Sequence, residues 1–145
     1  MQCTRRLAAA GILAVTMAAA VGAHAADADA LPPAHIAGHV TFLSGGIGLD
    51  ESTAIKRAAR SYPLELEFLM KGEPRDVYVA DVHVRIRDDQ GRTVLDTVAN
   101  GPFLLARLPA GRYDIVARSE GRSQSRHISL APGEHLRVPF EWATA

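Results

Sequence analysis

Histidines are the first residues of this chain to consider for chemistry, because imidazole nitrogens are common metal ligands. Five histidines follow residue 25, and the last two are His127 and His135. A turn at 132–134 would place these two on one hairpin but about four residues apart along it, too far to share an ion at ligand distances of about 2 Å. We therefore expect ordinary solvent-facing strand histidines and no metal site.

The sequence offers no set of residues for nucleophilic or acid–base catalysis. Ser44 stands before glycines without the G-x-S-x-G spacing of a hydrolase nucleophile, and the single cysteine, Cys3, lies near the start of the chain. Asp88-Asp89 is more simply a solvated turn than a pair of catalytic carboxylates. We expect no catalytic residues, no cofactor and no enzymatic activity.

A glycine-rich turn is the most distinctive local feature. Gly45 and Gly46 begin the sequence G-G-I-G just ahead of an expected helix, where backbone N–H groups can hold an anion. The turn lacks the Lys-Ser/Thr of a nucleotide-binding loop, and Asp50 and Glu51 would repel an anion. A tight connection from strand to helix is therefore the simpler interpretation, with an anion or small-ligand site as an alternative.

The N-terminus indicates export from the cytoplasm. A basic start with Arg5 and Arg6 precedes the uncharged apolar run Leu7–Val21, and Ala23-His-Ala25 has small residues where signal peptidase cleaves. We expect residues 1–25 to be a signal peptide, with the choice between general and twin-arginine export left open. The mature protein is then periplasmic or secreted and has no membrane span.

Composition limits the partners of the mature chain. Cleavage after residue 25 leaves 120 of the 145 residues, with 14 basic and 16 acidic side chains and no cysteine. That length is typical of one domain, and a hydrophobic core must stabilise it without disulfides. The near-neutral balance gives no electrostatic reason to expect nucleic acid or an anionic membrane as a partner.

The mature chain divides into three expected parts. Residues 26–37 contain two adjacent prolines and no periodicity, which predicts a flexible leader. Residues 38–63 predict a strand–helix appendage, with a short strand around Val40 and Phe42 and a helix capped by Asp50. Residues 64–145 alternate apolar and polar side chains with turn signals every eight to twelve residues, which is typical of a β-sandwich. Seven strands are expected there: Leu64–Met70, Val82–Ile86, Val94–Val98, Phe103–Leu108, Tyr113–Ala117, Ser123–Leu130 and Leu136–Trp142.

Two turn motifs carry a family resemblance. Thr97-x-x-x-Gly101-x-Phe103 and the later Leu108-Pro-Ala-Gly111-Arg-Tyr113 resemble the carboxypeptidase regulatory-like domains of the prealbumin-like, or transthyretin-like, β-sandwich group. The resemblance covers residues 62–142 and implies a seven-stranded antiparallel sandwich in which Gly101, Gly111 and Tyr113 are structural turn residues. It also implies an accessory, binding or spacer module. The strand–helix segment before it is not part of the usual domain.

The expected function is therefore binding without catalysis. We expect an exported module that binds an envelope protein through a loop end or an open strand edge. The alternative is a glycan or cell-wall binder, because related sandwiches bind sugars through exposed aromatic side chains. Tyr78 is the aromatic residue least committed to a core, whereas Trp142 continues the inward face of its strand and is expected to cap the core.

Overall fold

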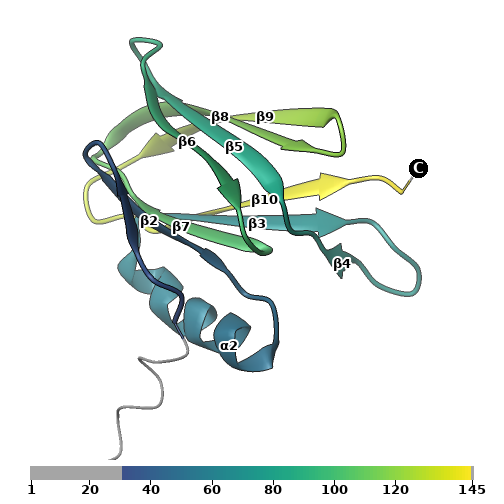
Figure 1. Cartoon of the computed structure of the whole chain (residues 1–145). Helices are drawn as coiled ribbons and strands as arrows, with labels where there is room; N and C mark the ends of the chain where they lie inside the picture. Colours follow the sequence, from purple (N-terminus) through teal and green to yellow (C-terminus); the bar gives the residue numbers. More distant parts are fainter. Residues whose placement is uncertain (1–30, 145) are drawn as a thin grey trace, which may run out of the picture.

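The computed structural model describes residues 31–144, so the expected signal peptide at 1–25 lies outside the described residues. Two β-sheets pack face to face, which confirms the mainly β class (Figure 1). Sheet A contains, in spatial order, β1 (His35–Ala37), β2 (Val40–Gly45), β7 (Phe103–Arg107), β3 (Leu64–Met70) and β10 (Leu136–Trp142), with β4 (Val77–Tyr78) pairing with β3. Sheet B contains, in spatial order, β6 (Thr93–Ala99), β5 (Val82–Asp88), β8 (Gly111–Ser119) and β9 (Arg122–Leu130).

The main core lies between the two sheets. Val82, Val84 and Ile86 of β5 are fully buried there because they alternate with polar residues on the opposite face. At one side of this core the Trp142 ring packs against the rings of Phe68 and Phe140, with centroids 6.4 and 6.2 Å away. Burial of one face of most long strands, among them β3, β5 and β8, therefore supplies the stability of residues 31–144, which contain no cysteine for a disulfide.

The N-terminal strand is part of the sandwich and not an appendage. Val40 and Phe42 enter the main core, whereas Leu43 packs on the other face of sheet A. β1 pairs with β2 at His35–Ala37, inside the segment expected to be a flexible leader. The expected separation of 38–63 from the sandwich was wrong because β2 pairs with β7 across five residues. Both strands bury side chains on the two faces of sheet A, in the main core and in the cluster on the opposite face.

The expected helix is confirmed as α2 (Leu49–Ala58), followed by the 3₁₀ turn η1 (Ala59–Ser61). Its N-cap is Gly48 and not Asp50, and no side chain caps it. Ile55 is fully buried against a second cluster on the outer face of sheet A that includes Leu43 and Phe103. α2 therefore covers a sheet face that would otherwise expose large apolar side chains.

The last strand differs from the expected antiparallel arrangement. β10 pairs in parallel with β3, from Leu136 opposite Leu64 to Trp142 opposite Met70. β9 lies in the other sheet, so the expected β9–β10 hairpin does not form. Alternation determines which face of β10 is buried but not which strand lies beside it. Pairing with β9 or with β3 would bury the same apolar side chains of β10.

The side of the sandwich between β9 and β10 is closed by polar contacts. Gln124 Nε2 donates to the backbone oxygen of Glu141 at 2.5 Å, and the Trp142 Nε1–H donates to the backbone oxygen of Arg122 at 3.1 Å. The Arg126 guanidinium lies 5.1 Å from the centre of the Phe140 ring. These contacts use polar groups along the side that two edge strands would otherwise leave open.

Two glutamates on the outer face of sheet A are buried, although alternation predicts only that they point away from the main core. Glu65 is 7% exposed and Glu67 is 3% exposed. The Arg137 guanidinium forms an ion pair with Glu67, and His135 Nε2 lies 3.1 Å from a Glu65 carboxylate oxygen. Each buried carboxylate on β3 is thus matched by a partner at or next to β10.

The pair formed by Glu67 and Arg137 gives a first prediction. We expect Arg137→Leu to lower the free energy of unfolding by about 1–3 kcal/mol, because it leaves a buried carboxylate without its partner. Urea denaturation followed by tryptophan fluorescence measures this value. The double variant Glu67→Leu/Arg137→Leu is the control and should recover most of the loss. Wild-type stability in the single variant would contradict the prediction.

Candidate functional site

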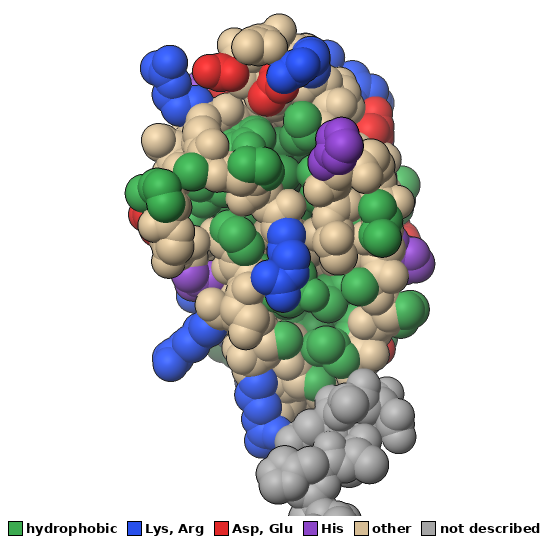
Figure 2. Space-filling view, turned by 90° about the vertical axis from the view of Figure 1, so that its left-hand side faces the viewer, with side chains coloured by type: hydrophobic (Ala, Val, Ile, Leu, Met, Phe, Trp, Pro, Cys, Tyr) green, Lys and Arg blue, Asp and Glu red, His purple; other side chains and the backbone are tan. Residues whose placement is uncertain are grey.

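Three turns meet at one end of the sandwich and enclose a groove. They join β1 to β2, β5 to β6, and β7 to β8, and the groove between them has a volume of about 550 Å³. Its apolar lining includes Val40, Val94 and Leu108. Figure 2 looks onto this end of the molecule and shows hydrophobic side chains gathered there, with charged side chains above them. We call this feature the loop-end groove.

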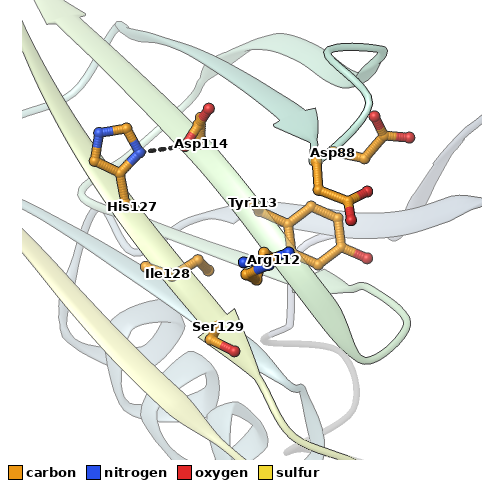
Figure 3. Close-up of a pocket in the computed structure, with 8 residues that line it drawn as sticks. Asp88, Arg112, Tyr113, Asp114, His127, Ile128 and Ser129 are labelled. Carbon is orange, nitrogen blue, oxygen red and sulfur yellow. Dashed lines mark hydrogen bonds and ion pairs between the residues drawn. The ribbon is translucent and has the colours of Figure 1, made fainter.

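A second hollow of about 520 Å³ shares a wall with the loop-end groove. Asp88, Asp89, Arg112 and Tyr113 line both hollows. On the far side the second hollow reaches β8 and β9, where the His127 ring pairs with the Asp114 carboxylate (Figure 3). The two hollows therefore form a continuous surface that bends around Tyr113.

Tyr113 is held firmly between these hollows. It is 7% exposed, and its hydroxyl donates to the backbone oxygen of Pro109 at 2.7 Å. Burial raises the pKa of the Tyr113 phenol, and the neighbouring carboxylates of Asp88 and Asp89 raise it further. The hydroxyl therefore stays protonated at neutral pH and fixes the turn that carries Gly111. Gly111 and Tyr113 thus both lie at the start of β8, directly after the turn from β7.

The two aspartates of the β5–β6 turn have different surroundings. Burial raises the pKa of Asp88, but hydrogen bonds from the Arg92 backbone and guanidinium and from the Gln90 backbone outweigh it and leave the pKa below its usual value. Asp88 is thus engaged in closing its own turn. Asp89 is exposed and forms no ion pair or hydrogen bond with another residue between 31 and 144. Its carboxylate is available to a ligand at the mouth of the groove.

The glycine turn lies at the opposite end of the strands. The Gly46 N–H donates to Glu51 Oε1 at 2.6 Å, and a Cβ on Gly45 would lie 2.2 Å from the same oxygen. The carboxylate that was expected to repel an anion therefore itself occupies the position that an anion would take. Gly101 lies against this turn, since a Cβ on it would approach the Gly45 backbone oxygen to 2.3 Å.

The two aromatic candidates for sugar binding have opposite environments. Tyr78 is 46% exposed on β4, with its ring centroid 5.3 Å from that of Phe103 and the Lys56 ammonium 5.7 Å away. Trp142 is 2% exposed inside the main core and offers no free ring face. A stacking site for sugar would therefore have to use Tyr78 without Trp142.

Sequence reasoning did not identify the loop-end groove as a site. Its turn signals are visible as Gly38, Asp88–Gly91 and Pro109–Gly111, but they are separated by about 20–50 residues in the chain. Only the sheet order shows that these turns share one end of the sandwich. The sequence therefore predicts the three turns one by one, but only the strand order shows that they lie side by side.

No family model matches this chain, and no curated protein matches it. Within residues 31–144, no group of three or more His, Cys, Asp or Glu side chains is arranged to hold a metal ion. No helix in the same range is long and apolar enough to cross a membrane.

Proposed function

We propose that this chain is a non-catalytic binding module of the cell envelope that holds an extended segment of a protein partner in the loop-end groove. The observation that carries the proposal is the groove itself, about 550 Å³ with an apolar lining and an exposed carboxylate at its mouth. This volume is within the range of specific binding sites, about 300–1,000 Å³. The groove is built on turns that a rigid sandwich positions, which is where binding residues are commonly found.

The chemistry of the groove defines the partner segment. An apolar side chain of the segment would contact Val94 and Leu108, and a lysine or arginine beside it would pair with Asp89. Arg112 also lines the groove without an ion pair within residues 31–144, and an acidic side chain of the segment would pair with it. The edge of β1 ends next to the groove at Gly38, and Ile36 on this strand is 77% exposed. An extended segment that enters the groove can thus continue along β1 by strand pairing.

Two features of the sequence support the same assignment. The motifs around Gly101 and Tyr113 resemble carboxypeptidase regulatory-like domains, and we assign β3 and β5–β10 to a prealbumin-like sandwich on that basis. The accessory role of such domains agrees with a binding module. The basic and apolar N-terminus at 1–25 supports export, which would place the groove in the periplasm or outside the cell.

The test is affinity capture with tagged mature protein from its own envelope fraction. We expect Asp89→Lys to reduce recovery of the protein partner at least tenfold, because it replaces attraction to a basic side chain by repulsion worth more than about 1.4 kcal/mol. Glu120→Lys is the matched control: it makes the same change of charge at an exposed turn at the other end of β8. Equal recovery by wild type and Asp89→Lys would overturn the proposal.

The glycan alternative has its own outcome in this design. The exposed ring of Tyr78 is the observation in its favour. Retention of the wild type on cell-wall glycan, lost in Tyr78→Ala and kept in Asp89→Lys, would replace a protein partner by a glycan. We expect Tyr78→Ala to recover the protein partner as well as the wild type does, since Tyr78 does not line the loop-end groove.

A further inference from the structure

The outer face of sheet B, turned away from sheet A, concentrates positive charge in a chain whose formal net charge is zero. Alternation along β5 places His83, Arg85 and Arg87 on this face, and strand register pairs Arg118 of β8 with His83. α2 lies on sheet A, and within residues 31–144 no element covers this face of sheet B (Figure 1). We call these four residues, with Val116 and Ser123, the basic hollow.

The basic hollow has a volume of about 250 Å³. Three of its six lining residues are arginines, and none of the six is acidic. A guanidinium is charged at every physiological pH and presents a planar fork of N–H donors that matches an oxyanion. The half-buried Val116 and the exposed Ser123 hydroxyl complete the lining. The size and donors of this hollow suit one small anionic group better than an extended apolar ligand.

One carboxylate, that of Asp96, borders the basic hollow, and it pairs with only some of the basic side chains there. Asp96 Oδ1 lies 2.5 Å from His83 Nε2, and Asp96 Oδ2 accepts from Arg85 Nε at 3.0 Å. The hydrogen bond with His83 lowers the pKa of Asp96, burial opposes it, and the contacts with Arg85 lower it further. The carboxylate therefore stays ionised and orients these two side chains.

Arg87 and Arg118 are not neutralised in this way. Neither guanidinium forms an ion pair or a hydrogen bond with another residue of the described range, 31–144. Asp114, which is opposite Arg87 across the strands, pairs with His127 instead. Arg87 and Arg118 thus line one hollow, four residue pairs apart in the register of β5 and β8, and neither guanidinium is paired with a carboxylate of residues 31–144. A bound anion would supply a partner to both.

We propose that the basic hollow binds a divalent oxyanion, phosphate or sulfate, with Arg87 and Arg118 as its principal ligands. The two charges of such an anion balance the two uncompensated guanidinium groups, and the Ser123 hydroxyl supplies a further donor. This site is separate from the proposed protein-binding groove because no residue lines both. Either site can therefore fail its test without affecting the other.

The experiment is a titration of the ¹⁵N-labelled mature protein with inorganic phosphate and, separately, inorganic sulfate, with ionic strength held constant by sodium chloride. We expect saturable amide shifts on β5 and β8 with a dissociation constant of about 1 mM, as for a small exposed anion site. Arg87→Gln and Arg118→Gln should each weaken binding at least tenfold. Both side chains are exposed, so the same spectra verify that the variants stay folded.

Arg75→Gln is the matched control, because it removes one exposed guanidinium from the loop between β3 and β4. It should leave the dissociation constant unchanged. Shifts that never saturate, or an equal loss in Arg75→Gln, would show attraction to overall charge and overturn the proposal. A loss in Arg60→Gln but not in Arg118→Gln would place binding at the basic surface of α2 and η1 and overturn it as well.

Sulfated dextran distinguishes a free anion from one carried on a larger molecule. Binding at least about a hundredfold tighter than inorganic sulfate, and weakened by Arg118→Gln, identifies an anion presented repeatedly on a polymer. Binding no tighter than inorganic sulfate identifies the single anion as the ligand. Both results support the basic hollow as the site, and they differ only in the source of the oxyanion.

Discussion

Trp142→Ala is expected to lower the free energy of unfolding by about 3–5 kcal/mol, the range for removing a large aromatic side chain from a core. Trp142 is 2% exposed and packs against the rings of Phe68 and Phe140. Its indole N–H also donates to the backbone oxygen of Arg122, so alanine removes a link between the two sheets. Because the only tryptophan is lost, unfolding in urea should be followed by far-ultraviolet circular dichroism.

Two further variants separate packing from ligand binding. Trp142→Phe keeps a ring in the core and should cost less, about 1–2 kcal/mol, mainly for the lost hydrogen bond and the smaller volume. Tyr78→Ala removes a half-exposed ring and should change stability by less than about 1 kcal/mol. If Trp142→Ala kept wild-type stability and lost only retention on glycan, Trp142 would be a binding residue and its assignment to the core would be wrong.

The alternation of apolar and polar residues predicted burial better than it predicted strand neighbours. Val84 and Phe140 face the core as their patterns require, because one face of each strand must leave water. The pattern in β10 is equally compatible with β9 and with β3, so the parallel pairing could not be read from it. The same limit applies to β2, whose alternation gave no sign that a helix would cover its second face.

Charge and turn chemistry were also readable only in part. Glu51 was expected to repel an anion at the glycine turn, and the fold instead brings its carboxylate onto the Gly46 N–H. That contact requires a side chain to bend back over five residues, which local propensity does not specify. The balanced net charge likewise concealed Arg87 and Arg118 on one face, because composition carries no information on where strands place their charges.

Gly101→Ala is the second substitution with a large expected effect, a loss of about 3 kcal/mol in the free energy of unfolding. A Cβ at this position would lie 2.3 Å from the backbone oxygen and 2.4 Å from the carbonyl carbon of Gly45. Both contacts are with backbone, so no side chain can rotate away to relieve them. The neighbouring hydrogen bond from the Asn100 N–H to Ser44 Oγ, 3.1 Å long, holds the two segments together and opposes their separation.

Gly91→Ala is the control that separates this steric cost from the conformational cost of losing a glycine. Gly91 has φ of +78° and open space around its Cα, so alanine there should cost only the left-handed backbone penalty, about 1–2 kcal/mol. Gly101 does not have positive φ, and its cost arises from the close approach alone. Urea denaturation of both variants compares the steric cost at Gly101 with the conformational cost at Gly91 directly. If Gly101→Ala were no less stable than Gly91→Ala, the segments at Gly45 and Gly101 would separate easily, and the turn motif would not hold β2 against the sandwich.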